Sequence, residues 1–172
     1  ARTELHVIMS TSMKRMRVYI DTSVLGGCFD TEFRDASQQF VQSVRDGRIL
    51  PLISEILLRE LREAPAEVQG LLSVILQGDV ERLEVTTDAV ELHEAYLRTS
   101  VVSTRYADDA LHVAVATVAR ADVLVSWNFR HMVNPIRIRA FNGVNTAQGY
   151  GPIIIMTPTD IVGLLEQEDE TA

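Results

Sequence analysis

Short runs of consecutive apolar residues alternate along this chain with segments in which apolar residues recur every three or four positions. A short continuous apolar run is typical of a buried strand, and the three-to-four spacing is typical of an amphipathic helix. The runs predict strands over residues 18–20, 49–53, 83–85, 123–127 and 153–156. The spacing predicts helices over residues 33–45, 55–63, 65–76, 89–98, 107–119 and 159–165.

Small residues mark the ends of several predicted helices. Ser54 directly precedes one helix and can cap it, and Thr87 or Asp88 can cap the helix that starts at residue 89. Asp108 is interpreted as the N-cap of the strongly apolar helix that follows it. Gly47 is expected to end the helix that precedes it.

The alternation of strands with helices predicts the fold class. We expect an α/β fold of three layers, α/β/α, with a central parallel sheet of four or five short strands covered by helices on both faces. A chain of 172 residues is the size of one ordinary domain. We assign residues 13–172 to that domain and interpret residues 1–12, which show no clear period, as an N-terminal extension outside it.

The first predicted strand runs directly into polar residues in the sequence YIDTSV. In open α/β sheets, ligands bind beside the carboxyl ends of the strands, so Asp21 stands where a ligand is expected. Glu60 and Asp109 are expected at the same edge of the sheet, and Asn128 follows the strand that contains the only tryptophan. Each of these residues alone also has an ordinary structural explanation.

Those ordinary explanations differ from residue to residue. Asp21 can cap the next segment, Glu60 can be a solvated helix residue, and Asp109 can favour the helix dipole. His112 shares a helix face with Asp109 but is more commonly a buried histidine with satisfied hydrogen bonds than a ligand. Asn128 can simply terminate a strand. Only the joint arrangement favours a functional site.

Carboxylates that converge on one edge repel one another. Two unit charges about 5 Å apart interact by about 3 kcal/mol at an effective dielectric constant of 20. A divalent cation or a proton among the acids relieves this repulsion, and oxygen ligands suit Mg²⁺ or Mn²⁺. The chemistry that such a site favours is metal-assisted hydrolysis of phosphodiesters.

Composition limits the kinds of partner that the chain can bind and the cellular compartment that is expected. The net charge of −8, from 24 acidic and 16 basic residues, excludes binding of nucleic acid by bulk charge, so a polyanion needs a metal ion or a local arginine patch. No apolar run is long enough for a membrane span. Cys28 is the only cysteine, which rules out a disulfide within the chain and fits a cytoplasmic location.

Four motifs in a fixed order resemble those of the PIN-domain nucleases: VYIDTSVL, ISEILLREL, DDALHVAVA and DVLVSWNFRH. The likeness is closest to the VapC-like toxin branch of toxin–antitoxin pairs and extends from about Arg17 to Leu165. It implies a parallel sheet with an acidic pocket that binds Mg²⁺ or Mn²⁺ and cleaves RNA. The matching acids are Asp21, Glu60 and Asp109, which the resemblance assigns to metal binding and catalysis.

The fourth acidic position of the family is Asn128 in this chain, which lowers the negative charge of the implied pocket. Residues that would support the acids are Asn128, Asp108, Thr22, Ser23 and Ser126. Residues that would contact RNA are Arg105, Arg130 and His131, which have the alternative of being solvated loop residues.

Other functions stay open. A phosphoryl-transfer receiver and a haloacid-dehalogenase-like hydrolase also place an aspartate after the first strand. The receiver needs an upstream pair of acids that residues 1–20 do not supply after a strand, and the hydrolase needs a second aspartate where this chain has Ser23. The main alternatives are a catalytically silent PIN-fold binding module and a nuclease of RNA processing that is not a toxin. The resemblance also implies a small antitoxin partner and a homodimer.

Overall fold

A parallel sheet of five strands forms the middle of the computed structural model, which describes residues 15–171. The strands are β1 (Met16–Ile20), β2 (Ile49–Ser54), β3 (Glu81–Leu83), β4 (Val123–Val125) and β5 (Ile155–Met156). Their order is β3-β2-β1-β4-β5, and every neighbouring pair is parallel. This confirms the predicted α/β class and the parallel sheet. The direction of strand order changes at β1, so the switch point lies between β1 and β4.

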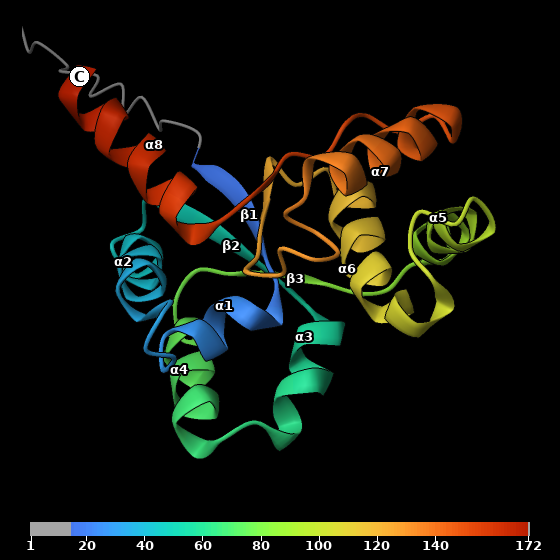
Figure 1. Cartoon of the computed structure of the whole chain (residues 1–172). Coiled ribbons are helices and arrows are strands. Elements are labelled where there is room, and N and C mark those ends of the chain that lie inside the picture. Colours follow the sequence, from blue (N-terminus) through green and yellow to red (C-terminus); the bar gives the residue numbers. More distant parts are fainter. Residues whose placement is uncertain (1–14, 172) are drawn as a thin grey trace, which may run out of the picture.

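Helices cover both faces of the sheet (Figure 1). One face packs against α1 (Thr22–Gly27), α2 (Arg34–Arg45), α4 (Ala66–Leu76) and α8 (Pro158–Thr171). The other face packs against α5 (Thr87–Arg98), α6 (Ala107–Val118) and α7 (Pro135–Ala147). The side chains of β1 alternate between these two cores, with Val18 and Ile20 in one and Tyr19 in the other. The helix α3 (Glu55–Glu60) follows β2 at the carboxyl edge and continues into a 3₁₀ turn, Leu61–Glu63.

Two helices were not predicted. α1 is short and ends in two glycines, but Asp21 caps it and it buries Val24 and Leu25 against the sheet. α7 has a largely polar sequence and buries mainly Phe141 and Asn145, so its apolar spacing is weak. It starts where Asn134 accepts hydrogen bonds from two backbone N–H groups just before a proline, a strong local start signal.

Several predicted boundaries move. β1 begins at Met16 rather than at residue 18, and β5 covers residues 155–156 rather than 153–156. β3 lies at residues 81–83 rather than 83–85, and α8 continues to Thr171 rather than ending at 165. β4 ends at Val125, not at Trp127, because the backbone N–H of Trp127 turns to the side chain of Ser23. A strand that leaves its ladder there directs the residues after it toward the edge of the sheet.

The helix caps are partly as predicted. Ser54 accepts a hydrogen bond from the N–H of Leu57, as expected. The N-cap of α5 is Thr86, one residue before the predicted candidates, so Thr87 and Asp88 lie within the first turn. Tyr106 rather than Asp108 is the N-cap of α6, because the 3₁₀ turn Thr104–Tyr106 leads directly into that helix.

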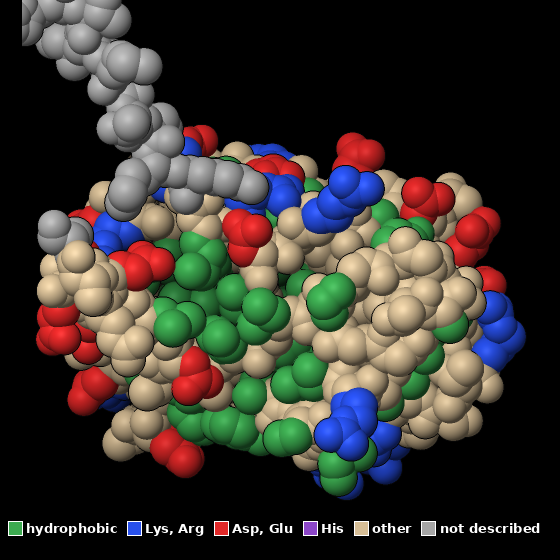
Figure 2. Space-filling view, turned by 90° about the horizontal axis from the view of Figure 1, so that it is seen from above, with side chains coloured by type: hydrophobic (Ala, Val, Ile, Leu, Met, Phe, Trp, Pro, Cys, Tyr) green, Lys and Arg blue, Asp and Glu red, His purple; other side chains and the backbone are tan. Residues whose placement is uncertain are grey.

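The amino ends of the strands face the viewer in Figure 2. Hydrophobic side chains gather in the middle of this face, and acidic and basic side chains lie mostly around its rim. No helix within residues 15–171 is long and apolar enough to cross a membrane. The extension predicted over residues 1–12 lies outside the described residues.

Candidate active site

A cavity of about 480 Å³ lies where β1 and β4 end, and it contains the three predicted acids. Its lining is Asp21, Thr22, Ser23, Gly26, Gly27, Asp30, Phe33, Glu60, Asp109, His112, Trp127 and Asn128. A larger groove of about 580 Å³ runs beside the edge strand β3 and contains none of the predicted site residues. The candidate site is therefore the smaller cavity, which lies at the switch point of the sheet.

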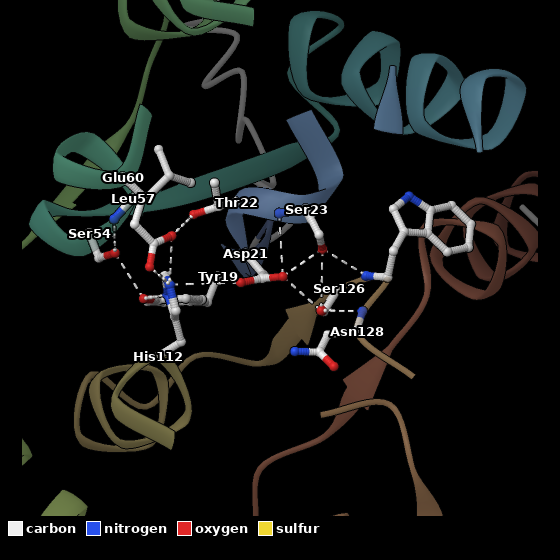
Figure 3. A network of polar contacts seen from close by, with 11 residues as sticks. Tyr19, Asp21, Thr22, Ser23, Ser54, Leu57, Glu60, His112, Ser126 and Asn128 are labelled. Atoms are coloured by element: carbon white, nitrogen blue, oxygen red, sulfur yellow. Dashed lines mark hydrogen bonds and ion pairs between the residues drawn. The ribbon is translucent and has the colours of Figure 1, made fainter. Parts of the chain in front are cut away.

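Asp21 is buried, and serine hydroxyls hold one of its oxygens. Its Oδ2 accepts hydrogen bonds from Ser23 Oγ at 2.5 Å and from Ser126 Oγ at 2.8 Å. Ser23 and Ser126 in turn accept the backbone N–H groups of Trp127 and Asn128, each at 2.9 Å. These bonds tie the carboxylate to the segment that follows β4. They leave Oδ1 on the side of His112, as Figure 3 shows.

Glu60 is the last residue of α3, and its side chain extends into the cavity. Its carboxylate accepts a hydrogen bond from Thr22 Oγ1 and lies 3.2 and 3.3 Å from Nε2 of His112. Burial alone would raise the pKa of Glu60, but the hydrogen bonds from His112 and Thr22 outweigh burial and hold the pKa below its usual value. Thr22 thus orients one acid and Ser23 the other, although the two residues are adjacent.

His112 connects the acids to the core. Its Nδ1 lies 2.7 Å from the hydroxyl of Tyr19, which donates a hydrogen bond to Ser54 Oγ at 2.8 Å. Because the Tyr19 proton goes to Ser54, the Tyr19 oxygen accepts from Nδ1–H of His112. If the opposite nitrogen, Nε2, donates to Glu60, both ring nitrogens carry protons, and this pattern requires the imidazolium form of His112.

The electrostatics agree with a charged His112. Burial alone would lower the pKa of His112, but the hydrogen bond with Glu60 and the nearby negative charges raise it above its usual value. Nε2 also lies 3.8 Å from Oδ1 of Asp21. Below the folded pKa of His112, one buried positive charge therefore lies between two of the three acids.

Asp109 lies in the first turn of α6, and Asn128 faces it. Burial raises the pKa of Asp109 above its usual value, and a hydrogen bond from the Asn128 side chain opposes that rise. The Asn128 oxygen, Oδ1, accepts the backbone N–H of His131 at 2.9 Å. Only the amide nitrogen of Asn128 is therefore directed to the acids, and it acts as a donor.

The remaining predicted residues fall outside the cavity lining. Asp108 is exposed. Arg105 and Arg130 are exposed and lie over the ring of Tyr106, at 5.6 and 5.7 Å from its centroid. His131 is only 7% exposed and stacks on the same ring at 3.8 Å. The two arginines are thus open to a ligand, whereas burial withdraws His131 from the surface.

The donor set fits a hard divalent cation in kind. Asp21, Glu60 and Asp109 offer carboxylate oxygens to one cavity, which is the ligand type that Mg²⁺ and Mn²⁺ prefer. Within residues 15–171, no group of three or more His, Cys, Asp or Glu side chains lies close enough together to hold a metal ion as it stands. Binding an ion would therefore require the acids to draw closer, and His112, when protonated, offsets part of their charge.

Sequence reasoning undervalued two features of the site. The first is the chain of contacts through His112 and Tyr19. The only sequence signal for it was the three-residue spacing that places Asp109 and His112 on one helix face. The second is an aromatic wall, in which Phe33 and Trp127 line the cavity. Phe33 precedes its helix and lies 94 residues before Trp127 in a sequence that gives no sign of their contact.

Comparisons with known proteins agree with this fold. A family model described as PIN domain matches residues 17–130. Among solved structures, the fold is similar to a chain of VapBC2 from Rickettsia felis, crystallised bound to a DNA fragment from the VapBC2 promoter. The two chains share 15% identity with a TM-score of 0.52, and the match covers 83% of this chain and 98% of the other. A search of curated proteins gave no match.

Proposed function

This chain belongs to the PIN-domain family, and from that premise we propose that it is an Mg²⁺- or Mn²⁺-dependent endoribonuclease that hydrolyses phosphodiester bonds of RNA. The observation that carries the proposal is that Asp21, Glu60 and Asp109 come from three separate elements to one cavity at the switch point of the sheet. Packing needs no such convergence of acids, and their mutual repulsion opposes it.

The residues of the chain divide the work in this proposal. Asp21, Glu60 and Asp109 hold the cation, which when bound supplies a water of lowered pKa and offsets charge on the phosphate. Ser23 and Ser126 keep Oδ2 of Asp21 occupied, so that Oδ1 is the oxygen left for a ligand. Neighbouring hydrogen bonds of this kind fix the orientation of ligand carboxylates.

A second candidate is a PIN-fold binding module without catalysis, and Asn128 favours it. Its oxygen is used by the backbone of His131 and its nitrogen donates to Asp109. Asn128 therefore adds no charge to the cavity, and its oxygen already accepts one backbone hydrogen bond. A site with three acids binds a divalent cation less tightly than one with four, because fewer charges compensate its dehydration.

The proposal extends to biology through the resemblance alone. We place the protein in the cytoplasm as the toxin of a type II toxin–antitoxin pair, blocked by a small antitoxin protein and assembled as a homodimer. The hydrophobic middle and charged rim of the face in Figure 2, at the opposite ends of the strands from the cavity, support the homodimer interface. A solution mass near 19.2 kDa, the mass of one chain, would contradict the dimer. A ribonuclease without an antitoxin gene beside its own would instead be a processing nuclease.

The deciding experiment compares two neighbouring aspartates. Purified wild-type protein is incubated with single-stranded RNA in Mn²⁺, in Mg²⁺ and in EDTA, alongside Asp21→Ala and Asp109→Ala. We expect cleavage that needs the metal and that both substitutions abolish. Asp108→Ala is the matched control, because Asp108 is exposed and outside the cavity lining. Absence of cleavage under every metal condition would favour the silent module.

A further inference from the structure

We infer that three aromatic side chains beside the acidic cavity form a stacking site for an unpaired base of single-stranded RNA. We call Phe33, Trp127 and Phe129 the aromatic platform. Phe33 and Trp127 are stacked with ring centroids 4.5 Å apart, and Phe129 lies 6.1 Å from Trp127 and 6.4 Å from Phe33. The inference deepens the proposed ribonuclease function and rests on it for the position of the substrate phosphate.

Two rings of the aromatic platform line the same cavity as the acids, and the third, Phe129, packs against both of these rings. Phe33 and Trp127 line the cavity together with Asp21, Glu60 and Asp109. A nucleotide carries a phosphate and a flat aromatic base on one sugar. The cavity offers one surface suited to each part, because the acids suit a cation-bound phosphate and the rings suit a base.

The aromatic platform is held in place before any ligand arrives. Trp127 Nε1 donates to the buried hydroxyl of Ser37 at 2.8 Å, and its backbone N–H donates to Ser23 at 2.9 Å. Gly27 packs so closely that an added Cβ would lie 2.8 Å from Trp127 Nε1. A surface that is already ordered loses little conformational entropy on binding.

Exposure distinguishes the aromatic platform from core packing. Phe129 leaves 50% of its surface to solvent, while Phe33 and Trp127 are partly exposed. Burying an aromatic ring is worth more than leaving it in water, so an exposed ring beside a polar cavity is suited to a flat ligand. Phe129 also follows directly on Asn128, which faces Asp109.

The charge of the protein makes such a contact useful. A chain with net charge −8 repels the phosphate backbone over long distances. Base stacking is attractive for every base and does not depend on opposite charges. Bases within a duplex are already stacked on one another, so a stacking site favours single strands or splayed-out nucleotides.

The test uses the single tryptophan as its reporter, because Trp127 is itself part of the aromatic platform. Full-length protein in EDTA is titrated with a six-nucleotide single-stranded RNA, and Trp127 fluorescence is followed. The matched ligand is the same ribose–phosphate hexamer without bases. We expect the RNA to quench Trp127 and the abasic hexamer to leave it unchanged.

Variants then separate the ring from mere apolar area. Phe129→Ala and Phe129→Leu should each weaken binding about tenfold, and Phe129→Tyr should restore it. Phe29→Ala is the control, because Phe29 is also an exposed phenylalanine, at 39%, but is not one of the three packed rings of the aromatic platform. Because stacking is not ionic, the fold-loss in Phe129→Ala should be the same at 50 mM and at 300 mM salt. Melting temperatures check that each variant is folded.

The outcomes are distinguishable from those of the proposed function. Quenching that the abasic hexamer or duplex RNA reproduces, or that survives in Phe129→Ala, overturns the stacking site. Cleavage in Mn²⁺ with an unchanged KM in Phe129→Ala and no quenching overturns it while the ribonuclease stands. Quenching that depends on Phe129 without any cleavage supports the stacking site and removes the enzyme. Absence of both quenching and cleavage contradicts the stacking site and the ribonuclease, and it would leave the aromatic platform as a contact for a protein partner.

Discussion

Nε2 of His112 lies 3.2 Å from Oε2 of Glu60, and this pairing places the buried imidazole ring at a cavity lined by acids. Its other nitrogen is held by Tyr19, which is fully buried. Tyr19 therefore holds the ring on the core side, and Nε2 faces the acids of the cavity. Below its folded pKa, His112 is positively charged and offsets part of the repulsion among the three acids that share the cavity.

The first prediction concerns the pH dependence of stability. The pKa of His112 is raised above its usual value of 6.5 on folding, so the pairing contributes stability that is fully present below about pH 6.5 and is lost as the pH rises through the folded pKa. In EDTA, the free energy of unfolding of His112→Gln should therefore differ most from that of the wild type near pH 6 and approach it at higher pH. Urea denaturation from pH 6 to 9 measures the difference.

Two controls accompany this titration. Glu60→Gln removes the partner and should flatten the wild-type slope in the same pH range. His93→Gln removes a histidine whose Nε2 contacts the carbonyl oxygen of Ala107, and it should leave the slope intact. A slope that persists unchanged in Glu60→Gln would show that the pairing does not control the stability of the fold.

The second prediction concerns the amide at the fourth position. Asn128→Asp places a carboxylate next to Asp109, which removes a donor and adds repulsion. Without metal, the variant should be less stable than the wild type. With Mn²⁺ it should bind the ion about tenfold more tightly, because a fourth acid supplies charge that the cation neutralises. Calorimetric titration with Mn²⁺ measures both proteins, and equal affinity would mean that residue 128 does not reach the ion.

Much of the fold follows from local patterns, and the missing parts are those whose stability comes from tertiary contacts. The buried strands were visible because residues buried on both sheet faces read as continuous apolar runs. α1 was invisible because a sequence ending in Gly26 and Gly27 has low helix propensity. It forms because Asp21 caps it and because Val24 and Leu25 are buried against the sheet. Gly27 is required at its position because a larger residue would not fit beside Trp127.

The candidate site was predictable in its acids and not in their surroundings. A carboxylate after a strand can be placed from sequence, because the topology of a parallel sheet decides where the strand ends. The hydrogen bond from Ser126 to Asp21 joins residues 105 positions apart, and nothing local announces it. The role of Asn128 as a donor depends on which of its side-chain atoms the turn at His131 uses, which only the folded chain determines.

The third prediction tests the orientation of Asp21. Ser126→Ala removes a fully buried hydroxyl that donates to Oδ2 and accepts the N–H of Asn128. We expect metal-dependent cleavage to fall by about 10- to 100-fold, because an unsupported ligand carboxylate loses its orientation. The protein should also lose about 1–2 kcal/mol of stability. The control is Ser73→Ala, an exposed serine that bonds only within its own helix, and activity that survives in Ser126→Ala would remove this role.

The fourth prediction compares two adjacent glycines of α1. A Cβ at Gly27 would lie 2.6 Å from Ser37 Oγ and 2.8 Å from Trp127 Nε1, whereas a Cβ at Gly26 meets nothing within 4 Å. Gly27→Ala should therefore push Trp127 away from Ser37 and destabilise the protein by about 1–3 kcal/mol. Gly26→Ala should be neutral or gain up to about 1 kcal/mol from helix propensity. Thermal unfolding measures the stabilities, and the emission wavelength of Trp127 reports its displacement. Equal melting temperatures and unchanged emission in the two variants would show that the close packing at Gly27 does not hold Trp127 in place.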